Sequence, residues 1–191
     1  MVGGRVKAVD SNLLVYASLA DHPATTVCEQ YLTEGSAWIT NVVNLVELYR
    51  VLIAVYGVTE TDADAKFADL CNALVVEDLT ASLAKAALPL RRTFGIDFND
   101  AVLLESCRQR GIAVLGTDDS RLADACAALG ISVENPVAES IRTQMKHWES
   151  GNLPAKGLPR LLARVHQSTE QRDPALAGVF HSATQGLSRL V

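Results

Sequence analysis

The chain has 191 residues, of which 49% are hydrophobic and 20% charged, and its formal net charge at pH 7 is −5. This length and composition suffice for a buried core and fit one domain of ordinary size with an appendage. They exclude a membrane span, because the best apolar candidate, residues 42–56, is interrupted by Asn44, Glu47 and Arg50, well short of the roughly 18 to 20 apolar residues that a spanning helix needs.

The N-terminus loosely imitates a secretory leader, since Arg5 and Lys7 precede the run LLVYASLA. However, Asp10 and Asn12 stand where an unbroken apolar stretch should begin, so we expect a cytoplasmic protein. The scattered cysteines form no CxxC pair and are expected to be reduced packing residues, not zinc ligands. They are Cys28, Cys71, Cys107 and Cys126.

Short apolar runs rich in Val, Ile and Ala alternate with longer segments of helical period along most of the chain. This pattern predicts an α/β fold in which helices cover both faces of a parallel sheet. Strands are predicted at 6–10, 37–40, 74–77, 112–116 and 131–133. Helices are predicted at 11–21, 23–35, 41–57, 59–72, 80–95, 98–111 and 120–130, with a kink or turn at Pro89.

The alternation stops after residue 136, where two or three helical segments follow, separated by the turn sequences GNLPAKGLP and QRDP. Residues 1–136 are therefore predicted to form one domain and residues 137–191 a helical C-terminal extension. The two parts differ in charge. The first carries 10 Lys and Arg against 18 Asp and Glu, or −8, and the second 7 against 4, or +3.

Acidic residues recur where predicted strands end or helices begin, which in a parallel sheet is the edge that binds ligands. Any one of them could be a helix cap or a partner of the helix dipole. Independent caps, however, have no reason to gather at one edge, so we predict a pocket of carboxylates. The candidates are Asp10, Glu47, Asp97 or Asp100, and Asp118 or Asp119.

Several carboxylates stay ionised at close range only when a cation compensates them, and oxygen ligands suit Mg²⁺ or Mn²⁺. No histidine lies near these positions, and the sequence has no P-loop, GxGxxG or HExxH motif. A water activated by the metal is then the expected nucleophile. Two such ions would serve an in-line displacement at phosphorus, so the pocket favours phosphodiester hydrolysis.

Four stretches, AVDSNLLVYA, NLVELYRVL, FNDAVLLESC and LGTDDSRLADACAALGISVENP, resemble in order and spacing the motifs of PIN-domain ribonucleases, particularly VapC-type toxins, over residues 5–136. The resemblance implies a PIN-like three-layer α/β/α fold with a central parallel sheet and Mg²⁺- or Mn²⁺-dependent cleavage of RNA. It implies metal ligands at Asp10, Glu47, Asp100 and Asp119, with Asp97 and Asp118 as second choices, and supporting roles for Asn12 and Thr117. We also expect a homodimer and, as a possible partner, an antitoxin protein.

Two other hypotheses remain open. The stretch GTDDSRLADACAALGI also resembles the late motif of haloacid-dehalogenase-type phosphatases. Those enzymes place a second Asp two residues after the nucleophile, where this chain has Asn12, and the hypothesis leaves Glu47 and Asp100 without a role. A non-catalytic PIN-like module that binds RNA or a protein is the third possibility, and the intact acids argue against it.

RNA binding by so acidic a domain needs positive charge from elsewhere. Bound metals would supply part of it, and the remaining candidates are Arg91, Arg92, Arg108, Arg110, Lys156, Arg160 and Arg164. The extension also carries an apolar helical stripe that is expected to pack on the chain's own domain, although a dimer contact or an antitoxin would also fit. The stripe consists of Leu158, Leu161, Leu162 and Val165.

Overall fold

The computed structural model describes residues 6–34 and 37–184. Its strands form one parallel sheet in the order β3-β2-β1-β4-β5. They are β1 (Val6–Val9), β2 (Ala37–Asn41), β3 (Val75–Glu77), β4 (Val114–Gly116) and β5 (Ser132–Glu134). The helices are α1 (Ser11–Ser18), α2 (Thr25–Thr33), α3 (Val42–Val51), the π-helix η1 (Leu52–Tyr56), α4 (Glu60–Ala73), α5 (Ala81–Phe94), α6 (Phe98–Arg110), α7 (Ser120–Ala128), α8 (Glu139–Asn152), α9 (Leu158–Arg172) and α10 (Pro174–Ala183).

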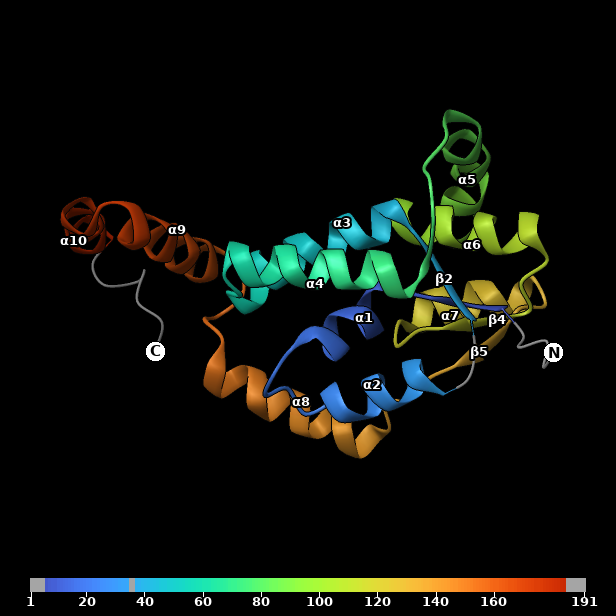
Figure 1. Ribbon diagram of the computed structural model, residues 1–191, viewed down its shortest axis with the longest axis horizontal. Coiled ribbons are helices and arrows are strands. Elements are labelled where there is room, and N and C mark those ends of the chain that lie inside the picture. The colour runs from blue at the N-terminus through green and yellow to red at the C-terminus, as the bar shows by residue number, and fades with distance from the viewer. Residues whose placement is uncertain (1–5, 35–36, 185–191) are drawn as a thin grey trace.

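Neighbouring residues of the central strands point to opposite faces of the sheet, as the two-residue period of a strand requires. Ala8 and Ile39 belong to a core shared with α5, α6 and α7. Val9 and Trp38 belong to a second core, shared with α1 to α4 and α8. Helices thus cover the sheet on both sides (Figure 1), and the predicted three-layer α/β/α fold is confirmed.

All five predicted strands are present, within two residues at either end. The helix predicted at 41–57 continues from α3 into η1 before Gly57, whose positive φ of 72° ends it. Of the two alternatives at Pro89, the turn is wrong, because α5 runs through this residue as one helix, and the kink stays a prediction. The predicted helix end at Gly35 lies outside the described residues, as do 185–191 of the extension.

The cysteines are all free, and Cys28, Cys107 and Cys126 are buried as predicted. Cys71 is exposed on α4, so its assignment as a packing residue is wrong. None of the helices in the described part of the chain is long and apolar enough to cross a membrane.

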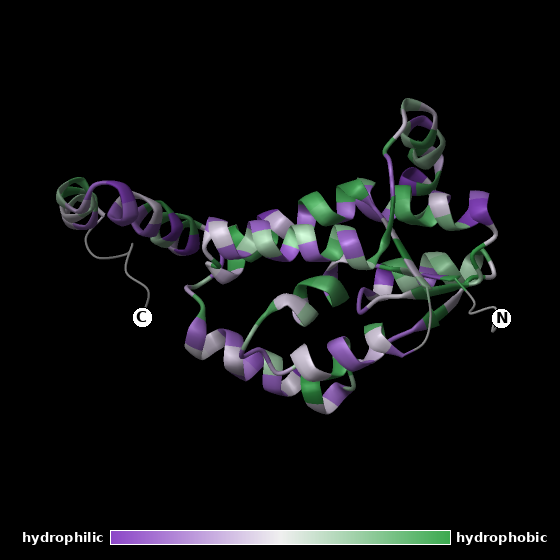
Figure 2. Cartoon of the chain, viewed as in Figure 1, coloured by the Kyte–Doolittle hydropathy of each residue, from purple (hydrophilic) through white to green (hydrophobic). Residues whose placement is uncertain are grey.

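The extension departs from expectation. α8 packs beside the second core through the buried Met145, but α9 and α10 project away from the sheet (Figure 1). Leu158, Leu161 and Val165 are 60%, 61% and 41% exposed, and Figure 2 shows hydrophobic segments on these projecting helices. The prediction that this stripe packs on the chain's own domain is therefore wrong.

The physical reason is that α9 meets the body of the molecule through polar contacts. Arg164 Nη2 donates to the carbonyl of Val55 at 2.6 Å, and Gln167 Nε2 donates to that of Gly57 at 3.2 Å. These contacts orient the helix by its Arg and Gln side chains, and its apolar stripe is left facing solvent.

Candidate metal centre

Asp10 lies at the carboxyl end of the central strand β1, where it is the N-cap of α1. Its side chain is 3% exposed. Oδ1 accepts from the backbone N of Ser11 at 2.6 Å, and Oδ2 accepts from Thr117 Oγ1 at 2.8 Å. An ordinary N-cap oxygen accepts from the second or third amide of its helix. Asp10 instead turns one oxygen toward the end of β4, so capping alone does not account for it.

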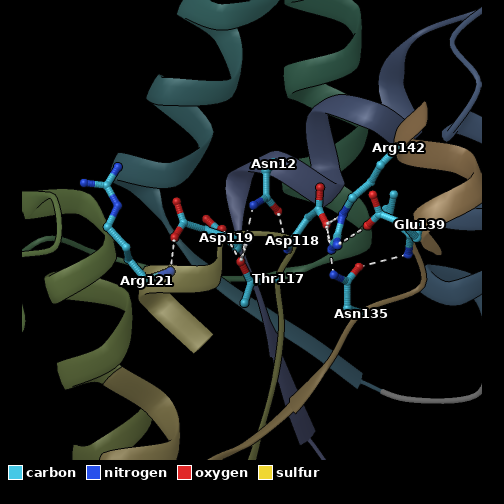
Figure 3. A network of polar contacts seen from close by, with 10 residues as sticks. Asn12, Thr117, Asp118, Asp119, Arg121, Asn135, Glu139 and Arg142 are labelled. Carbon is cyan, nitrogen blue, oxygen red and sulfur yellow. Dashed lines mark hydrogen bonds and ion pairs between the residues drawn. The ribbon is translucent and has the colours of Figure 1, made fainter. Parts of the chain in front are cut away.

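Thr117 fixes this orientation. Its hydroxyl donates to Asp10 and accepts from the backbone N of Asp119 at 2.9 Å and from Asn12 Nδ2 at 3.3 Å. A hydroxyl has one proton and two acceptor lone pairs, so these three contacts satisfy its full hydrogen-bonding capacity. Asn12 Oδ1 also accepts from the backbone N of Asp118 at 3.4 Å. Hydrogen bonds thus join the turn after β4 to the start of α1 (Figure 3). Asn12 and Thr117 lie where they could orient the neighbouring acids, as their expected supporting roles require.

Glu47 reaches the same place from the middle of α3. It is half-buried, and its Oε2 accepts from Ser11 Oγ and from Asn99 Nδ2, both at 3.1 Å. Ser11 Oγ also lies 3.3 Å from Asp10 Oδ1. One hydroxyl therefore bridges the two acids, and the half-buried charge of Glu47 is held by hydrogen bonds, which offset part of the cost of desolvating it.

Asp100 lies in the first turn of α6 and is half-buried. Burial raises its pKa to about 7, assisted by the charges of Asp10, Asp119, Glu47 and Asp97, in that order. No hydrogen bond to its carboxylate occurs within the described residues. Asp97 is the exposed N-cap of the same helix and makes no capping bond. The structure therefore favours Asp100 over Asp97 as the acid that faces the cluster.

The neighbouring acids of the β4–α7 turn have different surroundings. Asp119 caps α7 with Oδ1 alone, which accepts from the backbone N of Arg121 and of Leu122 at 2.7 and 3.0 Å. Asp118 Oδ1 instead accepts from Arg142 Nη2 at 2.5 Å and from Asn135 Nδ2 at 2.9 Å (Figure 3). Asp118 is thus neutralised by an arginine of α8, whereas Asp119 Oδ2 has no such partner in the described residues.

The four acids influence one another electrostatically. The pKa of Asp10 is raised to about 6, chiefly by burial and in addition by the charges of Glu47 and Asp119, against the opposing effect of the Thr117 hydrogen bond. Glu47 and Asp119 are also among the groups that raise the pKa of Asp100. No lysine or arginine pairs with any of the four in the described ion pairs. This surplus of negative charge is what a bound cation would compensate.

The donor set fits a hard divalent ion, because it consists of carboxylates only. Asn44 precedes Glu47 by three residues on α3, is 1% exposed, and has neither amide atom hydrogen-bonded within the described residues, so it is a buried polar side chain that lacks a partner beside the acids. No three His, Cys, Asp or Glu side chains of the described chain already stand close enough to share an ion. Binding would therefore require carboxylates to turn inward, and Asp100 and Asp119 have the uncommitted oxygens to do so.

Two of the residues around the acids were not predicted from the sequence. Ser11 and Asn99 are polar neighbours of Asp10 and Asp100 in the chain, so their adjacency was an available indication. Nothing in the sequence indicated the ion pair between Asp118 and Arg142, since these residues are 24 positions apart and on opposite sides of the predicted domain boundary.

Comparisons with known proteins agree with this fold. A family model described as PIN domain matches residues 7–128, a range that includes all four acids. The structure of VapC20 from Mycobacterium tuberculosis, described as a sarcin-ricin loop cleaving toxin, is similar with a TM-score of 0.55 and 22% identity, over 62% of this chain and 94% of that one. VapBC2 from Rickettsia felis, bound to a DNA fragment from its promoter, is similar with a TM-score of 0.52 and 16% identity, over 68% and 98%. At these identities the two structures show a shared fold alone, and no curated protein matches the sequence.

Proposed function

This chain belongs to the PIN-domain family, and from that premise we propose that it is a Mg²⁺- or Mn²⁺-dependent endoribonuclease that hydrolyses phosphodiester bonds in RNA. The observation that carries the proposal is the position of Asp10, Glu47, Asp100 and Asp119 along the carboxyl edge of the sheet, where the pKa values of Asp10 and Asp100 are raised and no compensating cation occurs among the described residues. Residues of four separate elements contribute to this cluster, which a set of structural caps would not require.

Each acid has a distinct part in this proposal. Asp10 is the fixed ligand, since hydrogen bonds hold both of its oxygens at the buried end of β1. Glu47 is held beside it by Ser11 and Asn99. Asp100 and Asp119 would complete the set by turning their free oxygens inward. Ions held there would stabilise charge on the scissile phosphate and lower the pKa of an attacking water.

The toxin role is a finer part of the proposal. VapC20 is described as a sarcin-ricin loop cleaving toxin, and VapBC2 is described as bound to a DNA fragment from its promoter. By analogy with these fold relatives we propose that this chain is the toxin of a toxin-antitoxin pair, acts in the cytoplasm as a homodimer, and is bound by an antitoxin protein. The family match covers residues 116–128 of the stretch at 116–131 that also resembles haloacid-dehalogenase phosphatases, so that alternative is set aside.

The proposal is tested by incubating the purified chain with a structured RNA in Mn²⁺ and in excess chelator, and separately with a small phosphate monoester. We expect RNA fragments in Mn²⁺, none with chelator, and no monoester turnover. Cleavage that survives chelation would refute metal dependence. RNA that is bound but left intact would instead favour a non-catalytic module, and turnover of the monoester would restore the phosphatase hypothesis.

A further inference from the structure

The positive charge of the extension is concentrated where α8 meets α9. Among its described cations, Arg142 pairs with Asp118 and Glu139, and Arg172 lies 3.8 Å from Glu60. The others have no carboxylate within 4 Å in the described part of the chain. These unpaired cations are Lys146, Lys156, Arg160 and Arg164.

Three of these cations line a single hollow of about 510 Å³ between the second half of α8 and the start of α9. Lys146 and Lys156 are exposed, and Arg160 is half-buried. Arg160 Nε donates to the carbonyl of the buried Pro154 at 3.1 Å, which anchors the guanidinium and leaves its terminal nitrogens without another described partner. Glu149 is the one acid in the lining, so the hollow keeps a net positive charge.

The hollow is connected to the acid site by one face of α8. Arg142, Lys146, Glu149 and Leu153 follow one another at helical spacings of three or four residues, so they share a face. An adjacent flank of the helix, with Met145, packs into the core. Arg142 lines a separate hollow beside Asp118 and Asp119. From Arg142 to Leu153 the helix rises about 16 Å, so a polyanion lying along α8 can reach both ends.

We propose that this hollow, defined by Lys146, Lys156 and Arg160, binds backbone phosphates of the RNA whose cleavage is proposed above. This inference rests on that proposed function. Lysine and arginine are the side chains that neutralise phosphates. The domain that carries the acids has a net charge of −8 and would repel an RNA strand without such an anchor. Two arginines suggested by the sequence are less available, since Arg108 and Arg110 are ion-paired with Glu105 and Glu77.

The test compares RNA binding by two double variants with the same change in charge. Lys146→Ala/Lys156→Ala removes the two exposed lysines of the hollow, and Lys66→Ala/Lys85→Ala removes two exposed lysines of α4 and α5. Binding of a fluorescent RNA hairpin is followed by anisotropy at several salt concentrations, with chelator present to prevent cleavage. For the first variant we expect about tenfold weaker binding and a slope of log affinity against log salt concentration that is smaller by about one, the value for one phosphate contact. For the second variant we expect less than about a twofold change in affinity. Lys146→Arg/Lys156→Arg should bind like the wild type.

Equal losses in the two Ala variants, or no loss in either, would overturn the proposal, and the latter result would point to a protein partner for this surface. Melting temperatures within about a degree of the wild type exclude a folding defect at these exposed positions. If the wild type cleaves RNA but the Lys146→Ala/Lys156→Ala variant binds normally, only this inference fails. If the wild type never cleaves RNA while that variant still loses binding, the proposed hydrolysis fails and the phosphate-binding surface stands.

Discussion

Replacing Asp100 by Asn is expected to lower RNA cleavage about a hundredfold or more, whereas replacing Asp97 by Asn should change it less than about threefold. Losing one carboxylate from a divalent-metal site typically costs orders of magnitude in activity. Asp100 is half-buried and surrounded by the charges of the other acids, while Asp97 is exposed three residues earlier. Initial rates of RNA cleavage in Mn²⁺ measure both effects.

The two substitutions make the same chemical change within one turn of the same helix, so each serves as the control for the other. Asp10→Asn should match Asp100→Asn in activity, because it removes the ligand that Thr117 and Ser11 hold in place. Comparable activity of the Asp97 and Asp100 variants would show that the pocket has been assigned to the wrong acids.

In the absence of divalent ions, the free energy of unfolding is expected to fall as pH rises from about 5.5 to 8. The folded-state pKa values of Asp10 and Asp100 are raised from 3.8 to about 6 and about 7. A carboxyl whose folded pKa is raised binds its proton more tightly when folded, so its stabilising effect is lost as pH rises through that value. For the fully buried Asp10, about 1 kcal/mol is lost between pH 5.5 and pH 8, since the larger part of its effect is already lost between pH 3.8 and pH 5.5.

Urea unfolding curves at pH 5.5 and pH 8 in chelator measure this loss. Hydrogen bonds from Lys7 and Tyr31 lower the pKa of Glu134. Its opposite effect on the free energy of unfolding therefore occurs at more acidic pH, outside this range.

The Asp10→Asn/Asp100→Asn variant should show a flatter profile and, at pH 8, a higher stability than the wild type. Burial lowers the pKa of His22 to about 4, which adds stability as pH rises toward 6.5 in the wild type and the variant alike. Equally steep profiles for the wild type and this variant would therefore contradict the charge clustering described for the site.

The sequence predicted the sheet well because its strands are short apolar runs separated by capped helices, a pattern that local residue chemistry determines. The same pattern put Asp10 and Asp119 at strand ends, and the parallel topology then brought them together. Choosing between Asp118 and Asp119 needed the long-range contact with Arg142, which no local pattern encodes. The family resemblance had already favoured Asp119, and the ion pair supplies a physical reason.

The extension was the least predictable part, for a related physical reason. Its apolar stripe at Leu158, Leu161 and Val165 indicated burial, but periodicity says only that a helix has an apolar face, not which surface covers it. Polar contacts of Arg164 and Gln167 with the end of η1 determine how α9 is placed. The exposed stripe and the basic hollow also lie beyond residues 7–128, the range that the family model matches. The family resemblance therefore gave no guidance on how this segment packs.

The most direct test of the central claim is anomalous X-ray scattering from crystals of this chain grown in saturating Mn²⁺. We expect a manganese peak bounded by carboxylate oxygens of Asp10, Glu47, Asp100 and Asp119, with Asp118 still paired to Arg142. Manganese found only elsewhere, with these four carboxylates free of any ion, would contradict the assignment of the metal centre.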